Sequence, residues 1–305
     1  MPMEKIIYQV DAFTDIPFGG NPAAVVPDAV GLTDRQMQQI AREMNVSETA
    51  FITKQEDGFA DFQVRFFTPT QEVDLCGHAT VGAFFVLAKK GYIEGDQKIK
   101  IVKQKTGAGI LPVEIYFEAD EVAHIYMTQT KPRFAFSIEN IRELAEIMKL
   151  GEEDIGLRGM NAVPQVISTG LPDIILPIKN LDALKKIDPD WNVLAAYSNR
   201  LGVVGVHAFS LETEEKDSDL ACRNFAPAAG INEEAATGTS NGALGAYLIQ
   251  NNIIPWSGEH TLLCEQGYYM DRPSKILVKL EGSKEDLVVK VGGKAVITLE
   301  GVMMV

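Results

Sequence analysis

Cysteine and histidine flank one glycine in Cys76-Gly77-His78, directly before ten residues that carry no charge. These three residues could form a catalytic pair, contribute to a metal site or line the start of a buried helix. A thiolate at a helix N-terminus has a lowered pKa and can act as a base or a nucleophile. The positive end of a helix dipole disfavours a charged imidazole, so we expect His78 to act as a neutral donor or acceptor. A histidine that only caps the helix is the alternative.

A single carboxylate, Glu48, lies between the predicted helix stop at Asn45 and an apolar strand in the stretch NVSETAF. Beside Phe51 it could be held in partly apolar surroundings that raise its pKa, as a general acid or base requires. A carboxylate that simply faces water is the other interpretation. We take Glu48 as the candidate for proton transfer and its neighbour Ser47 as a candidate for substrate binding.

A second polar turn, EEAATGTSNG, carries Glu233 and Glu234 just before a predicted helix start. Acidic residues in this position can serve only as helix caps. In a functional interpretation, the hydroxyl of Thr239 and N–H groups near Gly238 hold a substrate while one glutamate orients a polar partner.

The second turn contains no cysteine at the place that corresponds to Cys76. A racemase that uses two bases would need a thiol in both turns, one for each face of the substrate carbon. The sequence therefore disfavours a mechanism with two thiols, and Cys76 is interpreted as a small buried residue.

Two segments, residues 79–88 and 239–252, are apolar or small on every side, which is typical of buried helices. Each follows a copy of the pattern R-x-F-x-P, at residues 65–69 and 223–227. Short alternating runs in the rest of the chain predict strands. The shared order favours an internal duplication.

These elements predict an α+β fold of two pseudo-symmetric lobes, each with a β-sheet curled around a central buried helix. A chain of 305 residues exceeds the roughly 250 to 300 at which one core stops growing. The basic stretch at Lys131 to Arg133 suggests lobes of residues 1–130 and 131–305. If the lobes are duplicates, the two helix N-termini face a common cleft, where their N–H groups and dipoles would favour a small carboxylate.

The composition narrows the classes of partner. A net charge of -14 repels phosphate backbones and anionic lipid surfaces, so we expect neither nucleic acid nor membrane as a partner. The start MPMEKIIYQV lacks a signal-peptide pattern, and no apolar run reaches the ~18 residues of a membrane span, which predicts a cytoplasmic protein. Three cysteines and four scattered histidines show neither disulfide nor metal-ligand spacing, so we expect no metal.

Taken in order, five segments resemble the phenazine-biosynthesis PhzF-like family. They are DAFTDIPFGGNPAAVV, NVSETAFI, RFFTPTQEVDLCGHATVGA, RNFAPAAGINEEAATGTSNGALGAYL and QGYYMDRPSKILV, between residues 10 and 278. The resemblance implies the diaminopimelate-epimerase-like fold, a homodimer, and isomerisation of trans-2,3-dihydro-3-hydroxyanthranilate without a cofactor. It implies that Glu48 shuttles the proton and that His78, beside Gly77, positions the substrate.

In the second turn, the family commonly reads E-D-P-A-T-G-S where this chain reads E-E-A-A-T-G-T. Glu234 takes the place of the aspartate, Ala235 that of the proline and Thr239 that of the serine. These changes keep the charge and the hydroxyl but alter their reach, which bears on the identity of the substrate more than on the kind of chemistry, so the phenazine intermediate is one candidate among several. We therefore predict a cofactor-independent isomerase of a small cyclic or amino carboxylic acid. The alternatives are an epimerase or racemase that uses Cys76, and a non-catalytic protein that binds a small carboxylate.

Overall fold

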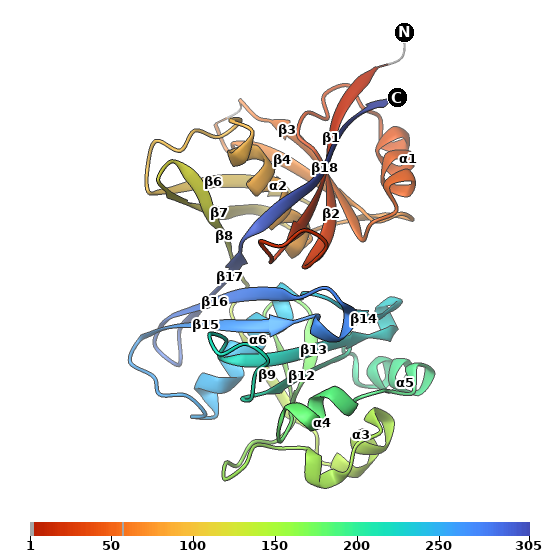
Figure 1. Cartoon of the computed structure of the whole chain (residues 1–305), viewed down its shortest axis with the longest axis vertical. Coiled ribbons are helices and arrows are strands. Elements are labelled where there is room, and N and C mark those ends of the chain that lie inside the picture. Colours follow the sequence, from red (N-terminus) through yellow and green to blue (C-terminus); the bar gives the residue numbers. More distant parts are fainter. Residues whose placement is uncertain (1–2, 57) are drawn as a thin grey trace. The chain divides into compact units, whose positions relative to one another are not determined.

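The computed structural model describes residues 3–56 and 58–305, and the chain divides into two compact units. Unit 1 comprises Met1–Thr128 and Gly292–Val305, and unit 2 comprises Gln129–Val291. The expected second lobe, residues 131–305, is therefore corrected at its end. The last strand, β18 (Ala295–Met304), pairs antiparallel with β1 (Glu4–Ala12) and so belongs to the sheet of unit 1 (Figure 1).

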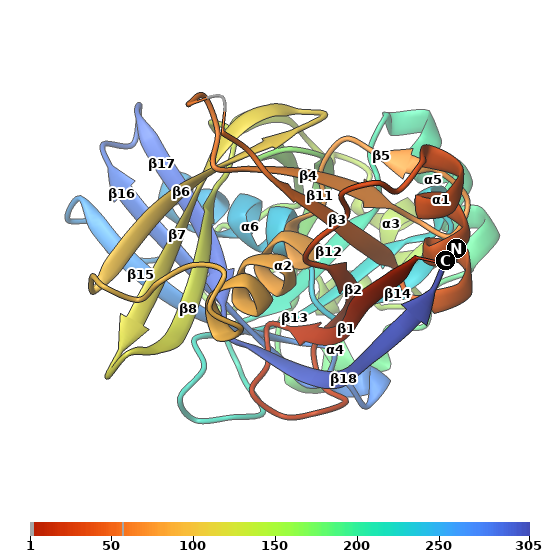
Figure 2. The same cartoon turned by 90° about the horizontal axis from the view of Figure 1, so that it is seen from above.

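Unit 1 is a sheet curled around one helix. Its remaining elements are β2 (Asn21–Val26), α1 (Asp34–Met44), β3 (Glu48–Lys54), β4 (Phe62–Phe67), β5 (Glu72–Val73), α2 (Gly77–Lys89), β6 (Ile99–Thr106), β7 (Gly109–Glu118) and β8 (Glu121–Thr128). Seen from above, strands of this unit lie on both sides of α2 (Figure 2). This is the buried helix that the apolar segment predicted, and almost all of its side chains are buried.

Helix α1 packs outside the sheet of unit 1 and sets the start of β3. The hydroxyl of Thr33 and the side chain of Gln36 form a reciprocal capping box at its beginning. It ends at Asn45, whose φ of 51° is left-handed, a conformation that asparagine adopts more readily than most residues. The predicted helix stop is confirmed, and the chain turns there into the strand that begins with Glu48.

Unit 2 repeats this plan with more helices on its outer face. Its elements are β9 (Arg133–Ser137), α3 (Ile141–Met148), η1 (Glu152–Asp154), β10 (Gln165–Ser168), β11 (Pro172–Pro177), α4 (Leu181–Lys186), α5 (Trp191–Leu201), β12 (Val206–Ser210), β13 (Leu220–Ala226), η2 (Pro227–Ala229), β14 (Ile231–Glu234), α6 (Gly238–Gln250), β15 (Glu259–Gln266), η3 (Tyr268–Met270), β16 (Ser274–Gly282) and β17 (Leu287–Gly293), which runs on into the last segment of unit 1.

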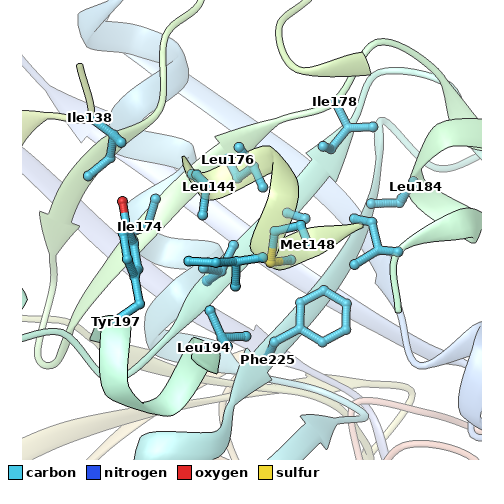
Figure 3. Close-up of a cluster of buried hydrophobic side chains, with 14 of the residues drawn as sticks. Ile138, Leu144, Met148, Ile174, Leu176, Ile178, Leu184, Leu194, Tyr197 and Phe225 are labelled. Carbon is cyan, nitrogen blue, oxygen red and sulfur yellow. The ribbon is translucent and has the colours of Figure 1, made fainter. Parts of the chain in front are cut away.

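The outer layer of unit 2 is held by a hydrophobic cluster. Side chains from α3 and α5, such as Leu144, Met148 and Leu194, meet Leu176 of β11 and Phe225 of β13 (Figure 3). Strands β12 and β13 are buried along their whole length, because α6 covers the face opposite to this cluster. A sheet covered on both faces leaves polar groups on its strands without access to water.

The strand registers show that the two units are copies of one topology. In unit 1, β2 runs parallel to β3, β3 antiparallel to β4, and β4 parallel to β6. In unit 2, β11 runs parallel to β12, β12 antiparallel to β13, and β13 parallel to β15. The central helices α2 and α6 both have 13 residues and follow a short strand. The predicted duplication therefore agrees with the folded topology of each unit.

The arginine of each R-x-F-x-P pattern makes the same contact in its own unit. Arg65 binds both carboxylate oxygens of Glu72 at 2.7 Å, and Arg223 binds both oxygens of Glu233 at 2.8 Å. Both pairs tie the central strand to the strand that leads into the buried helix. They differ in exposure, because the Arg223 pair is buried whereas the Arg65 pair is open to water.

We expect Arg223→Ala to destabilise unit 2 by about 3 to 5 kcal/mol, because it leaves Glu233 buried without its counter-ion. The equivalent Arg65→Ala breaks ion pairs with Glu72 and Asp34 that are open to water, and each should cost at most about 1 kcal/mol. Both tryptophans of the chain, Trp191 and Trp256, lie in unit 2, so tryptophan fluorescence in urea measures the loss in Arg223→Ala, and circular dichroism, which follows both units, measures the loss in Arg65→Ala. Equal midpoints for the two variants would contradict the expected difference.

Candidate functional site

A carboxylate and an imidazole form a close pair in unit 1. Oε2 of Glu48, the first residue of β3, lies 3.0 Å from Nε2 of His78, the second residue of α2. The two side chains are only 16% and 7% exposed. Oε2 has no well-aligned hydrogen bond among the described residues, so the contact acts chiefly as a charge pair. The fold thus joins two of the predicted site residues.

Two further side chains contact the imidazole on its other nitrogen. Sγ of Cys76 lies 3.4 Å from Nδ1 of His78, and the side-chain amide of Asn21 lies 3.3 Å from the same atom. Cys76 is the N-cap of α2, but its side chain makes no capping hydrogen bond. Asn21 opens β2, beside the start of β3, because the parallel register places Ala23 opposite Glu48. Asn21 was not predicted from the sequence.

The pKa of Glu48 differs from the sequence-based expectation. Burial by itself would raise the pKa of this carboxyl, but the contact with His78 and its charge outweigh burial and lower that pKa below its usual value. The expected raised pKa is therefore wrong. Glu48 is ionised in the folded protein at neutral pH and is available as a base.

His78 also titrates differently from the expectation. Burial by itself would lower the pKa of His78, but its neighbours Cys76 and Glu48 raise it well above its usual value. Burial raises the pKa of the Cys76 thiol, and of the two contacts that raise the pKa of His78 the one with Cys76 has the larger effect and the one with Glu48 the smaller. The expected neutral imidazole is therefore wrong. The contacts with Cys76 and Glu48 together outweigh the helix dipole, which contributes only about 0.3 to 1 kcal/mol.

The backbone beside this pair is open to a ligand. Gly77 is the first residue of α2, where N–H groups have no partner within the helix. A Cβ atom at Gly77 would meet no heavy atom within 4 Å. Ser47, which directly precedes Glu48, is half-buried. The arrangement suits an anionic group placed against the start of α2.

Glu48, Cys76 and His78 also have the composition of a possible metal site. Each offers one ligand atom, and these atoms lie within 4.8 Å of one another. The spacing of cysteines and histidines in the sequence shows no group of metal ligands, because spacing does not reveal that the fold brings Glu48 next to Cys76 and His78. A zinc ion here would need the thiolate form of Cys76. Burial raises the pKa of that thiol, so the donor set is poorly prepared for a metal.

The second predicted turn is assembled in unit 2 at the start of α6. The hydroxyl of Thr237, the N-cap, donates to Oε2 of Glu234 at 2.8 Å. Gln266 donates to the carbonyl of Glu234 at 2.7 Å and accepts from the N–H of Thr237 at 3.2 Å. Gly238 and Thr239 are the first two residues of the helix and are half-buried. Glu234, Gly238 and Thr239 therefore lie together, as their spacing in the sequence suggested.

Because the two units share one strand topology, the residues at equivalent positions of the two units can be compared. Thr237 is the N-cap of α6 as Cys76 is of α2, so the second unit has a hydroxyl where the first has a thiol. In the antiparallel strand pairs, Arg65 lies opposite Phe51 of β3 and Arg223 lies opposite Ala208 of β12. Three residues before Phe51 is Glu48, and three residues before Ala208 is Gly205. Glu48 and Gly205 are therefore equivalent positions of the two units. A Cβ atom at Gly205 would lie 1.8 Å from a backbone oxygen. The second unit therefore has room for no side chain at the position of Glu48.

Comparison with known proteins identifies the family. A family model described as phenazine biosynthesis-like protein (PhzC-PhzF) matches residues 10–301. A protein named as an uncharacterized isomerase in Clostridium acetobutylicum is 40% identical over 296 residues, or 96% of each chain. The trans-2,3-dihydro-3-hydroxyanthranilate isomerase of Pseudomonas aeruginosa is 30% identical, again over 96% of each chain.

A solved structure gives the same result. The crystal structure of a PhzF-family phenazine biosynthesis protein from Bacillus anthracis matches with a TM-score of 0.89 at 32% identity, over 99% of this chain and 100% of the other. In the described parts of the chain, residues 3–56 and 58–305, no helix has both the length and the apolar character to cross a membrane. The family resemblance and the fold class predicted from the motifs are confirmed. The chain belongs to the phenazine biosynthesis-like (PhzF) family and is an isomerase.

Proposed function

We propose that the protein moves a proton on a small cyclic or amino carboxylic acid, without a cofactor, and that Glu48 carries the proton. The observation that supports this most directly is the charge pair between Glu48 and His78, at a position where the duplicated unit has Gly205. One carboxylate must then both remove and return the proton. Relatives that bear the name isomerase support the same class of reaction.

The charge pair suits a proton shuttle. Because His78 holds Glu48 ionised, Glu48 enters the reaction as a base and accepts a proton from a substrate carbon. The electrons of the broken C–H bond pass into the substrate's unsaturated system. Protonation of Glu48 removes its attraction to the imidazolium, which favours release of the proton to a second carbon. His78 thus keeps Glu48 charged between turnovers.

The carboxylate of the substrate is assigned to the helix starts. N–H groups at Gly77, Gly238 and Thr239 lie in the first turns of α2 and α6, where the helix dipole favours an anion. Ser47 is a further candidate contact, and Glu234, held by Thr237, would orient a polar group of the substrate. The substrate of the Pseudomonas aeruginosa relative is the first candidate to test.

A second candidate is an epimerase that uses Cys76. The 3.4 Å contact between Sγ and Nδ1 of His78 favours it, since an imidazole can activate a thiol. The neutral thiol and the threonine at the equivalent position in unit 2 speak against it. The third candidate is a non-catalytic protein that binds small carboxylates. Such a protein would bind the carboxylate at the helix N-termini but would catalyse no exchange of the ligand's carbon-bound protons.

The setting proposed for the enzyme is the cytoplasm, as a homodimer. Cys76, Cys222 and Cys264 are all free thiols, which suits a reducing compartment. The net charge of -14 disfavours nucleic acid and anionic membranes as partners. Sedimentation in solution would test the dimer.

Deuterium uptake tests the proposed function. Incubation of the wild-type protein with trans-2,3-dihydro-3-hydroxyanthranilate and with a panel of cyclic and amino carboxylic acids in heavy water should give one compound that isomerises and gains deuterium at carbon. Proton NMR measures both changes. The activity should survive dialysis against a chelator, because Glu48 and His78 act without a metal. Binding of an acid with no exchange at any carbon would favour the non-catalytic candidate.

A further inference from the structure

A buried polar network lies under the first turn of α6. Oδ2 of Asp173, on β11, accepts a hydrogen bond from the hydroxyl of Ser240, the third residue of the helix. Asn224 of β13 donates to the same hydroxyl at 3.2 Å and lies 3.2 Å from Nδ1 of His207 on β12. Asp173 is 3% exposed and His207 is fully buried. Buried polar groups of this kind cost free energy unless they are bonded, so their bonds fix the elements that carry them.

Further hydrogen bonds hold the same turn from other sides. Asn241, the fourth residue of α6, donates to Gln266 and to the carbonyl of Thr237, both at 2.9 Å. The hydroxyl of Thr169 donates to the carbonyl of Thr239 at 2.8 Å. The turn that presents Gly238 and Thr239 is therefore anchored through side chains from several strands and loops of unit 2.

The duplicated unit 1 lacks this network. Ser240 is the third residue of α6, and the third residue of α2 is Ala79. The strand registers equate Asp173 with Ala23, Asn224 with Phe66 and His207 with Ala50. At these four positions, a buried helix of the same length therefore begins in unit 1 on apolar residues. The polar set in unit 2 is not a requirement of the fold, and it lies beneath the turn to which the substrate carboxylate is assigned.

We propose that Asp173 is a positioning residue: through Ser240, it holds the first turn of α6 in the arrangement in which the N–H groups of Gly238 and Thr239 bind the substrate carboxylate. This role rests on the proposed function, which places the carboxylate at this turn. Burial raises the pKa of Asp173 to about 6, and the charge of Glu234 acts in the same direction. At neutral pH the carboxyl is therefore mainly ionised and accepts the bond from Ser240.

The decisive variants are Asp173→Ala, Asp173→Asn and Ser240→Ala, with 3-hydroxyanthranilate as the binding probe. This aromatic acid has no ring hydrogen to move between carbons, so it reports binding alone. By calorimetry, Asp173→Ala and Ser240→Ala should each weaken binding about tenfold, which is the scale of one lost hydrogen bond to a charged group. The double variant should lose no more than either one. Asp173→Asn should bind nearly as the wild type does, because its amide oxygen still accepts from Ser240.

Kinetics and hydrogen exchange separate positioning from general damage. On the substrate found in heavy water, KM should rise about tenfold in Asp173→Ala while kcat stays within about twofold, since Glu48 and His78 are untouched. Without ligand, amide exchange should accelerate in the peptide that contains residues 238–241. Ser198→Ala is the matched control, because Ser198 is also buried in unit 2 but its hydroxyl has no hydrogen-bond partner among the residues that the structure describes. Its KM should equal that of the wild type.

Several other outcomes would overturn the role of Asp173. Wild-type affinity in Asp173→Ala, or equal losses in Asp173→Ala and Asp173→Asn, would show that the bond to Ser240 does not position the turn. A fall in kcat with KM unchanged would do the same. If the wild type isomerises its substrate but does not bind 3-hydroxyanthranilate, the carboxylate assignment fails together with this role. If it binds the probe and isomerises no acid, only the catalytic proposal fails.

Discussion

Glu48→Gln is expected to lower kcat about a thousandfold or more and to leave the affinity for small carboxylates within a few-fold of the wild type. The amide keeps the size of the side chain but cannot accept a proton from carbon, and general base catalysis supplies about 10²- to 10⁴-fold. Deuterium uptake into the substrate, followed by proton NMR, measures the loss. The pKa of His78 should fall in the same variant, because burial then acts without the carboxylate.

The matched control is Glu43→Gln, which removes a carboxylate on the exposed face of α1 in the same unit. It should keep wild-type kcat and KM. Unaltered turnover in Glu48→Gln would remove Glu48 from the mechanism. If that result came with loss of activity on alkylation of Cys76, the epimerase candidate would take its place.

His78→Gln is expected to lower kcat at pH 7 about a hundredfold and to move the acid limb of the pH profile upward. In the wild type, the contact with His78 lowers the pKa of Glu48 against the effect of burial. Without the imidazole, burial is opposed only by the smaller effect of the contact with Cys76, so the pKa of Glu48 rises and a larger share of Glu48 is protonated and unable to act as a base. Initial rates measured from acid to neutral pH show the shift.

The wild-type profile follows from the same two groups. Glu48 must be ionised, so activity should fall only as the pH drops through its lowered pKa, below the usual value of 4.5. His78 must be charged, so activity should decline a second time as the pH rises through the raised pKa of His78, which lies well above the usual histidine value of 6.5. The charge pair stabilises unit 1 in the same window, since it is lost when either group becomes neutral. His124→Gln, at another histidine of unit 1, should leave the acid limb unchanged.

Local sequence patterns were enough to predict the parts of the fold that depend on neighbours in the chain. The apolar character of residues 79–88 predicted α2, and the paired R-x-F-x-P patterns predicted the repeat of one topology. The capping residues of α1 predicted where the helix ends. Each of these signals is made of short local patterns, so it can be recognised without knowing the tertiary structure.

The properties that depend on tertiary contacts could not be predicted. The lowered pKa of Glu48 follows mainly from a 3.0 Å contact with His78, which is 30 positions later in the sequence, and the raised pKa of His78 follows from Cys76 together with Glu48. The helix dipole disfavours a charged His78, as expected, but the contacts with Cys76 and Glu48 outweigh it. Asn21 joined the site through the parallel pairing of β2 and β3; the only sequence signal for it was its place in G-G-N-P. The position of β18 required long-range pairing with β1.

The pairing of β18 with β1 has a consequence for the order of events during synthesis. The residues of unit 2, Gln129–Val291, lie in the chain between the two segments of unit 1. Because domains generally fold as units while the chain emerges from the ribosome, unit 2 can complete its core before β18 has been made. Unit 1, which carries Glu48 and His78, is therefore the first unit to be synthesised in part and the last to be completed. Until β18 pairs with it, one edge of β1 has unpaired backbone groups that can bond to a strand of another chain. We therefore expect the nascent chain to be most prone to aggregation, and most dependent on chaperones, before β18 has been synthesised.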